Sequence, residues 1–180
     1  AYRLILSGLC DAMVTGGTEA VMTPTCIAGF TNMTAMSSDN MSRPFDRDRN
    51  GFVLAEGSGI LVLEEMESAK ARGATILAEL MGAASNADAH HITAPSPGGV
   101  GAINCMRTAI ANAGLVPSDV TYVNAHGTST PLNDAAEAAA IAEVFGDTPP
   151  AVTSFKGVTG HALGGAGSLE AVGIVLGMQK

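Results

Sequence analysis

The sequence has no tryptophan, and aromatic residues make up only 4% of its 180 residues. It contains 9 lysines and arginines against 17 aspartates and glutamates, which gives a net charge of −8 at neutral pH. Proteins that bind nucleic acids typically carry clustered positive charge and aromatic residues that stack on bases. The shortage of both argues against a nucleic-acid-binding protein.

Long apolar runs and paired cysteines are also missing. Although 47% of the residues are hydrophobic, no run approaches the roughly 18 residues that a membrane-spanning helix needs. No charged segment followed by an apolar one resembles a signal peptide. The three cysteines, Cys10, Cys26 and Cys105, form no metal-ligand pattern and indicate reduced thiols. We therefore expect a cytoplasmic protein without a membrane span.

Both ends of the chain have helical patterns. Residues 1–7 are predicted as a helix without a cap. Another helix is predicted over residues 168–180, and no helix-ending residue precedes the end of the sequence. Because a natural domain rarely begins and ends within a helix, we expect a fragment of a longer protein. The 180 residues are enough for one domain with a hydrophobic core.

Between the ends, strand-like and helical patterns alternate. Short apolar runs predict strands at residues 11–15, 60–63, 76–85, 120–123 and 151–155. Helices are predicted at residues 29–36, 65–72, 102–113 and 135–145, in addition to those at the two ends. This alternation predicts an α/β fold with a mostly parallel sheet that helices cover on both faces.

The most informative stretch is VTYVNAHGTSTPLNDAAE at residues 120–137. His126 follows the predicted strand directly. Asp134 is predicted as the N-cap of the next helix, and Glu137 lies at the spacing of a capping box. In open α/β sheets, ligands bind outside the carboxyl ends of the strands. We therefore expect His126 to contact a substrate.

A second stretch, SFKGVTGHALGGAG at residues 154–167, repeats this placement. Lys156 and His161 come after another strand and before another helix. One histidine alone is equally consistent with a structural role, but two imidazoles and an ammonium at one sheet edge favour a functional site. Glu137 has two compatible roles, capping its helix or pairing with Lys156.

Two other motifs predict neither a cofactor nor a metal. The glycines at residues 160–167 resemble a dinucleotide-binding turn, but the acidic residue expected about 20 positions later is missing. DRDRNG at residues 46–51 resembles the start of an EF-hand, but Gly57 occupies the position of the bidentate glutamate. His90 and His91 are adjacent, so they make a poor chelate, and a solvated loop is the preferred interpretation.

Taken together, these motifs resemble those of the β-ketoacyl-acyl-carrier-protein synthases. The resemblance covers the whole chain and is carried by VNAHGTST (residues 123–130), KGVTGH (156–161), GGAG (164–167), PFD (44–46), GFVL (51–54), EG (56–57) and LE (63–64). The chain is most similar to the type II condensing enzymes of bacterial fatty acid synthesis. Modular polyketide ketosynthases more often have Gly at the position of Ser129 and Glu at that of Asn124.

The resemblance implies a thiolase-like fold, in which two related α/β halves form αβαβα layers and the full-length protein is a homodimer. Residues 1–73 would be the end of the N-terminal half with a loop insertion. Residues 74–180 would be a truncated C-terminal half.

The implied activity is that of an acyltransferase. A cysteine takes an acyl chain from acyl carrier protein, malonyl-carrier protein loses CO2, and the resulting carbanion attacks the acyl thioester to give a 3-oxoacyl product. The enzyme needs no cofactor of its own, since phosphopantetheine arrives on the carrier protein, which is the implied partner.

The resemblance also assigns residue roles. His126 and His161 would donate hydrogen bonds to the malonyl thioester oxygen as it becomes an enolate, and Lys156 would order the site and pair with the acid equivalent to Glu137. Thr128 and Thr130 would form hydrogen bonds with the pantetheine arm, and Phe30 would line the acyl tunnel. Asp88, His91 and Thr93 would lie in a mobile loop beside the pocket, and Asp134 would support the site.

The nucleophilic cysteine of this family would lie shortly before the first residue, and a gating phenylalanine would lie beyond the last. We therefore expect the 180 residues alone to be inactive. The alternatives are a polyketide ketosynthase, its non-catalytic chain-length partner, or a thiolase-like enzyme that does not decarboxylate. The presence of His126, His161 and Lys156 favours the condensing enzyme over a non-catalytic partner, which has no need for enolate donors. His161 argues against a thiolase-like enzyme, because those enzymes typically replace one histidine with a cysteine.

Overall fold

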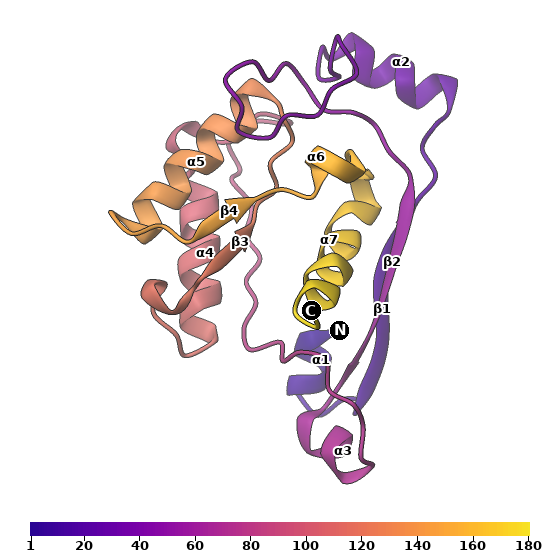
Figure 1. Ribbon diagram of the computed structural model, residues 1–180, viewed down its shortest axis with the longest axis vertical. Coiled ribbons are helices and arrows are strands. Elements are labelled where there is room, and N and C mark those ends of the chain that lie inside the picture. The colour runs from indigo at the N-terminus through magenta and orange to yellow at the C-terminus, as the bar shows by residue number, and fades with distance from the viewer. The chain divides into compact units, whose positions relative to one another are not determined.

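The computed structural model describes residues 1–180, which divide into two compact units. One unit consists of Ala1–Val21, Ala55–Leu80 and Ala162–Lys180, and the other of Met22–Leu54 and Met81–His161. Figure 1 labels the helices and strands of both units. None of the helices is both long enough and apolar enough to cross a lipid bilayer.

The first unit is built on an antiparallel pair of strands. β1 (Ala12–Glu19) pairs with β2 (Gly57–Glu64), in a register that runs from Ala12 opposite Glu64 to Glu19 opposite Gly57. The unit also contains the helices α1 (Tyr2–Leu6), α3 (Met66–Ala71) and α7 (Leu163–Gly177). α7 lies along the strand pair and packs against both strands (Figure 1).

Glycines in the strands allow α7 to approach the sheet backbone. A Cβ on Gly59 would lie 2.5 Å from the carbonyl oxygen of Ser168, and one on Gly17 would lie 2.6 Å from that of Gly164. The Ser168 hydroxyl also donates a hydrogen bond to the Gly17 carbonyl at 3.1 Å. The contact between helix and sheet therefore depends on the absence of side chains at these positions.

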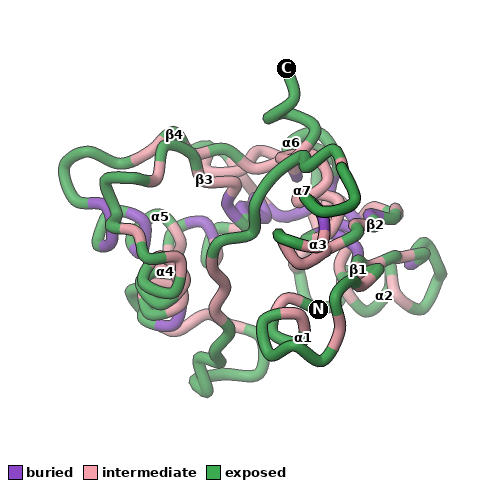
Figure 2. Tube along the Cα trace, turned by 90° about the horizontal axis from the view of Figure 1, so that it is seen from below, coloured by how far each residue is buried: buried purple, intermediate pink, exposed green.

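The opposite face of the strand pair is apolar and exposed. Val14 and Val62 are register partners with 71% and 67% of their surface exposed, and Ile60 is 59% exposed. α1 has no buried residue, and Figure 2 draws it in green and pink. Exposed apolar residues that are grouped in this way often mark a surface that further protein covers.

The second unit contains a parallel strand pair and most of the helices. Its elements are α2 (Pro24–Asn32), the 3-10 turns η1 (Pro97–Gly99) and η2 (Pro117–Asp119), α4 (Val100–Asn112), β3 (Tyr122–Asn124), α5 (Pro131–Phe145), β4 (Ala151–Thr153) and α6 (Lys156–Thr159). Ile141, Val144 and Phe145 of α5 form a buried cluster with Ala125. Residues of α4 and the register partners Val123 and Val152 pack against this cluster.

The predicted mostly parallel sheet is wrong for this chain, because β1 and β2 are antiparallel and only β3 and β4 are parallel. The strand predicted at residues 76–85 is also wrong, since this segment has no regular secondary structure. Its apolar residues suit a strand, but no segment of the chain pairs with it, and β propensity takes effect only beside a hydrogen-bonded neighbour.

The helices are confirmed in type but differ at their starts. α2 begins at Pro24 rather than near residue 29, because the Thr23 side chain accepts the Cys26 N–H at 3.3 Å as an N-cap. α5 begins at Pro131 with Thr130 as N-cap, so the capping roles predicted for Asp134 and Glu137 are wrong. Proline is well suited to the first position of a helix, where its missing N–H costs nothing.

The packing of α7 on the strand pair predicts that Gly59→Ala lowers the free energy of unfolding by roughly 1–3 kcal/mol, as overpacking typically does. In contrast, Gly29→Ala lies within α2, where an added Cβ meets nothing within 4 Å. We expect that control to leave stability unchanged or to raise it by about 0.5–1 kcal/mol. Urea unfolding of both variants measures the difference, and equal effects would contradict the proposed close contact.

Candidate active site

His126 lies just beyond the end of β3, in a segment that is held by backbone hydrogen bonds. The hydrogen bonding between β3 and β4 continues one residue past β3, since the Ala125 N–H donates to the Thr153 carbonyl at 2.7 Å. The two carboxylate oxygens of Glu137 then accept the N–H groups of His126, at 2.7 Å, and Gly127, at 2.8 Å. Glu137 therefore fixes the backbone of His126 from the second turn of α5.

Lys156 begins α6 three residues after the end of β4, and only 1% of its surface is exposed. Its Nζ donates to the carbonyl oxygen of His126 at 2.8 Å and lies 3.3 Å from Nδ1 of the same residue. An ammonium can only donate, so Nδ1 is the acceptor in this contact. The ring proton of His126 is then on Nε2, which is left as a hydrogen-bond donor.

His161 is positioned by the segment that contains Phe52 and Val53. Its N–H donates to the Val53 carbonyl at 2.7 Å, and its ring meets the edge of Phe52 with centroids 5.2 Å apart. On another side it meets the ring of His126, with centroids 5.3 Å apart and planes at 86°. The structure therefore brings together the histidine pair and Lys156, all within the second unit.

The charge state of His161 is set by its surroundings. Burial, the nearby positive charge of Lys156 and the ring of His126 together lower the pKa of His161 from 6.5 to about 4. The ring is therefore neutral near pH 7 and can offer one N–H donor. Its Nδ1 is buried and has no hydrogen-bond partner.

Thr128 and Thr130 lie beside the histidine pair in the loop that leads to α5. Their hydroxyls are 2.8 Å apart, and Thr128 is buried.

Asp134, which is almost fully buried, does not cap α5. Its carboxylate accepts the Phe45 N–H at 2.8 Å and lies 3.8 Å from Nε of Arg49.

Phe30 on α2 contacts the ring of Phe52 edge-on, with centroids 5.4 Å apart. Phe52 thus lies between Phe30 and His161. Phe52 also borders a cavity of about 130 Å³, whose other lining residues are Met22, Ile27, Met36, Ser37, Asn40, Val53 and Leu54. Phe30 does not line this cavity.

Asp88, His91 and Thr93 lie in the loop before η1, and their hydrogen bonds stay within that loop. Nδ1 of His91 accepts the N–H groups of Thr93 and Ala94, each at 3.1 Å. The Asp88 carboxylate accepts the Ser96 N–H at 2.8 Å. The structure shows a local turn here and no hydrogen bond from it to either histidine of the pair.

Two positions in the site were missed by sequence reasoning. Phe52 forms the ring contact with His161, and Ser154 connects the two loops, since its Oγ donates to the Gly127 carbonyl at 3.0 Å and accepts the Lys156 N–H at 3.2 Å. The placement of Ser154 directly after a strand and two residues before Lys156 was an available signal. Phe52 lies in the GFVL motif at residues 51–54, but nothing in that motif indicated its contact with His161.

The site therefore consists of neutral ring donors beside a buried cation. The residues of the chain form no cluster of three or more His, Cys, Asp or Glu suited to a metal ion. Such donors can stabilise negative charge that develops on a substrate oxygen.

The lowered pKa of His161 predicts a specific pH response. The unfolded imidazole binds a proton below about pH 6.5, whereas the folded one does so only near pH 4. The stability that depends on neutral His161 is therefore complete above pH 6.5 and is lost as the pH falls through 4. An NMR titration of the histidine rings measures the pKa of His161 in the folded protein.

Replacing the neighbouring charge tests the cause. Lys156→Met should raise the pKa of His161, because the ammonium that opposes its protonation is removed. Lys70→Met is the control, since Lys70 is exposed and paired with Glu67. An unchanged titration of His161 in Lys156→Met would contradict the proposed electrostatic coupling.

Sequence comparison identifies relatives of the chain. Residues 1–69 match the family described as "Beta-ketoacyl synthase, N-terminal domain", and residues 77–180 match "Beta-ketoacyl synthase, C-terminal domain". The chain is 51% identical to 3-oxoacyl-[acyl-carrier-protein] synthase 2 from Synechocystis, over 100% of the chain and 45% of the relative. It is 48% identical to the protein of the same name from Staphylococcus aureus, over 96% of the chain and 44% of the relative.

Solved structures give the same result. A beta-ketoacyl synthase from Burkholderia phymatum matches 99% of the chain with a TM-score of 0.94 and 41% identity, over 44% of its own length. A structure of a type II PKS acyl-carrier protein in complex with its ketosynthase bound to the hexaketide matches 97% of the chain, at a TM-score of 0.93 and 41% identity, over 45% of that chain. The chain thus spans about half the length of these relatives and has their thiolase-like fold. It belongs to the beta-ketoacyl synthase family.

Proposed function

We propose that the chain is part of a 3-oxoacyl-[acyl-carrier-protein] synthase that catalyses a decarboxylative Claisen condensation. The observation that carries this proposal is the pairing of His126 and His161, with ring centroids 5.3 Å apart, beside the buried Lys156. The relatives that are 48–51% identical bear this name. Since the chain covers 45% of the Synechocystis relative, the activity is proposed for the longer protein that carries these residues.

The proposed step begins with a malonyl thioester whose carbonyl oxygen lies near the two imidazoles. As the bond to the carboxylate breaks, CO2 leaves and the electron pair moves onto the thioester, which becomes an enolate. Two neutral N–H donors stabilise this oxygen most strongly when it carries the charge, that is, in the transition state. The enolate carbon then attacks an acyl thioester held on a cysteine, the thiolate leaves, and a 3-oxoacyl product forms.

The burial of Lys156 supports this assignment. A cation fixed 3.3 Å from Nδ1 of His126 keeps the ring proton on Nε2, which can then donate to a substrate oxygen. It also disfavours a second positive charge on His161. We propose that Lys156 acts through the histidines and not as a base.

The remaining positions are proposed by the same family resemblance. Thr128 and Thr130 would bind the pantetheine arm, and Phe30, His91 and Thr93 would border the substrate. Asp88, Asp134 and Glu137 would support the site; in the structure all three carboxylates accept backbone N–H groups. Residues 1–73 and 74–180 would be parts of the two halves of the synthase.

An acyl carrier protein is the proposed partner, because a ketosynthase of similar fold has been solved in complex with one. We also propose a cytoplasmic homodimer for the longer protein. The uncovered apolar face of β1 and β2 supports the need for further protein, since Val14 and Val62 are largely exposed there.

A polyketide ketosynthase or its chain-length partner is the second candidate. The ishigamide ketosynthase/chain length factor matches the chain with a TM-score of 0.92, over 97% of the chain and 42% of its own length. The relatives that are 48–51% identical are named 3-oxoacyl-[acyl-carrier-protein] synthase 2, which favours the first candidate.

The proposed role predicts the effect of removing either donor in the full-length protein. His126→Ala and His161→Ala should each lower CO2 release from malonyl-carrier protein by about 10²–10³, the usual effect of losing one donor to an oxyanion. Self-acylation of the nucleophile should persist in both. Release of labelled CO2 measures the first effect, and mass spectrometry of the acylated protein measures the second.

His90→Ala is the matched control, because His90 is exposed in a loop. We expect it to keep the original rate. Unchanged CO2 release in His126→Ala would contradict the assigned role.

The proposal also predicts the behaviour of the 180 residues alone. They should form no 3-oxoacyl product from acyl- and malonyl-carrier proteins, because the family's nucleophile is expected outside them. Measurable 3-oxoacyl formation by the isolated chain would contradict this expectation.

A further inference from the structure

Ser129 has an unusual backbone conformation for its residue type. Its φ is +66°, in the left-handed region that favours glycine, and its side chain is fully buried between Thr128 and Thr130. A serine that is kept in this conformation and away from water needs a compensating interaction. The hydroxyl and the carbonyl of Ser129 both make one.

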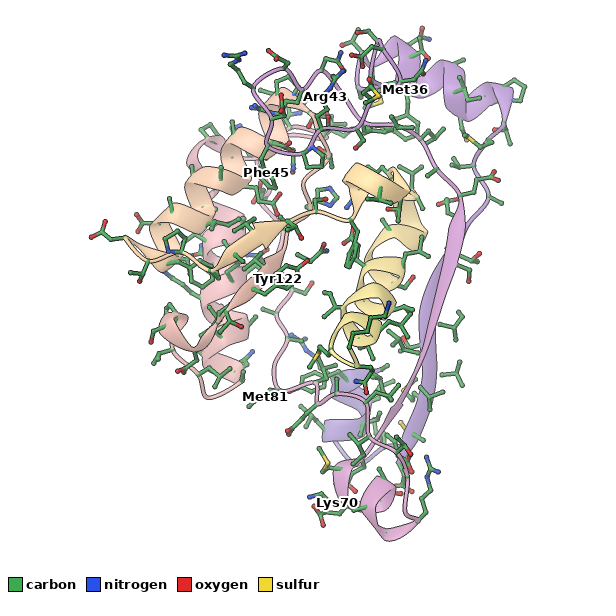
Figure 3. All side chains as sticks on the ribbon, viewed as in Figure 1. Met36, Arg43, Phe45, Lys70, Met81 and Tyr122 are labelled. Carbon is green, nitrogen blue, oxygen red and sulfur yellow. The ribbon has the colours of Figure 1, made fainter.

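Both groups of Ser129 accept hydrogen bonds from the loop at residues 43–51. Its Oγ accepts the Arg43 N–H at 2.9 Å, and its carbonyl accepts the Gly51 N–H at 2.9 Å. Ser129 thus binds both ends of this loop, which crosses the start of α5 and which Figure 3 marks with Arg43 and Phe45. Asp134 holds the middle of the loop through the Phe45 N–H.

The end of the loop leads directly into the residues that hold His161. Phe52 follows Gly51 and exchanges backbone hydrogen bonds with Ala35, at 3.0 Å, and Ser37, at 2.8 Å. Its ring meets that of His161, and the next residue, Val53, accepts the His161 N–H. A Cβ on Gly51 would lie 2.5 Å from the backbone of Met36, so the loop has little room to shift.

We propose that Ser129 is a positioning residue that, through the 43–51 loop and Phe52, sets the place of the His161 ring relative to His126. His126 lies three residues before Ser129 in the same segment, and that segment is itself bound by Glu137. A displacement of the loop would therefore change the spacing of the two rings. The catalytic part of this inference depends on the proposed function, whereas the structural part does not.

Substitutions at Ser129 separate positioning from simple stabilisation. Ser129→Ala loses the acceptor and keeps the unfavourable φ, whereas Ser129→Gly loses the acceptor and suits the φ. The glycine variant should therefore be the more stable of the two. If Ser129 positions the rings, both variants lower CO2 release at least tenfold in the full-length protein, since misplaced catalytic groups commonly cost up to 10²-fold. If it only stabilises the fold, the glycine variant regains the original rate.

A second measurement does not depend on activity. In both variants, the NMR titration of His161 should move from about pH 4 toward 6.5, because a displaced Phe52 exposes the ring. Ser129→Cys, which keeps the volume but accepts hydrogen bonds weakly, should show an intermediate shift. Ser168→Ala, which removes a serine hydroxyl outside the site, should leave the titration unchanged.

The outcomes distinguish the two proposals. A glycine variant with the original His161 titration and the original rate overturns the positioning role. A shifted titration together with unchanged CO2 release in His126→Ala supports the positioning role and overturns the proposed function instead.

Discussion

The contact between the buried Lys156 and His126 is the interaction on which the site depends. An ammonium that is removed from water must be compensated by hydrogen bonds, and here one goes to the His126 carbonyl while Nδ1 lies 3.3 Å away. The same charge helps to keep His161 neutral. One cation thus sets the tautomer of one ring and adds to the effect of burial in keeping the other ring neutral.

Other residues of the site hold Lys156 and His126 in contact. β3 and β4 are short parallel partners, so His126 and Lys156 follow neighbouring strand ends. Glu137 binds the backbone after β3 from α5, and Ser154 ties that backbone to the start of α6. Rigid backbone connections of this kind hold donors in place before charge develops, which is the condition for electrostatic stabilisation of a transition state.

Sequence reasoning predicted that the two histidines and the lysine come together, because their placement is encoded locally. His126, Lys156 and His161 each follow a strand whose apolar pattern is clear, and parallel neighbours bring such residues to one edge. Sequence reasoning failed where the structure depends on segments that are far apart in the sequence. Such segments determine the antiparallel pairing of β1 with β2 and the ring contact of Phe52. They also explain residues 76–85, which form no strand because no segment pairs with them. Helix starts failed for a different reason, because Pro24 and Pro131 mark the first turn more strongly than the acidic residues that follow.

The central claim is that His126 offers an uncharged Nε2–H donor because Lys156 faces Nδ1. Nitrogen-15 NMR of the imidazole rings at neutral pH measures the tautomer directly. We predict a neutral His126 ring with the proton on Nε2, and a change in the ring-nitrogen shifts in Lys156→Met. A His126 ring with its proton on Nδ1, or with protons on both nitrogens, would contradict the account.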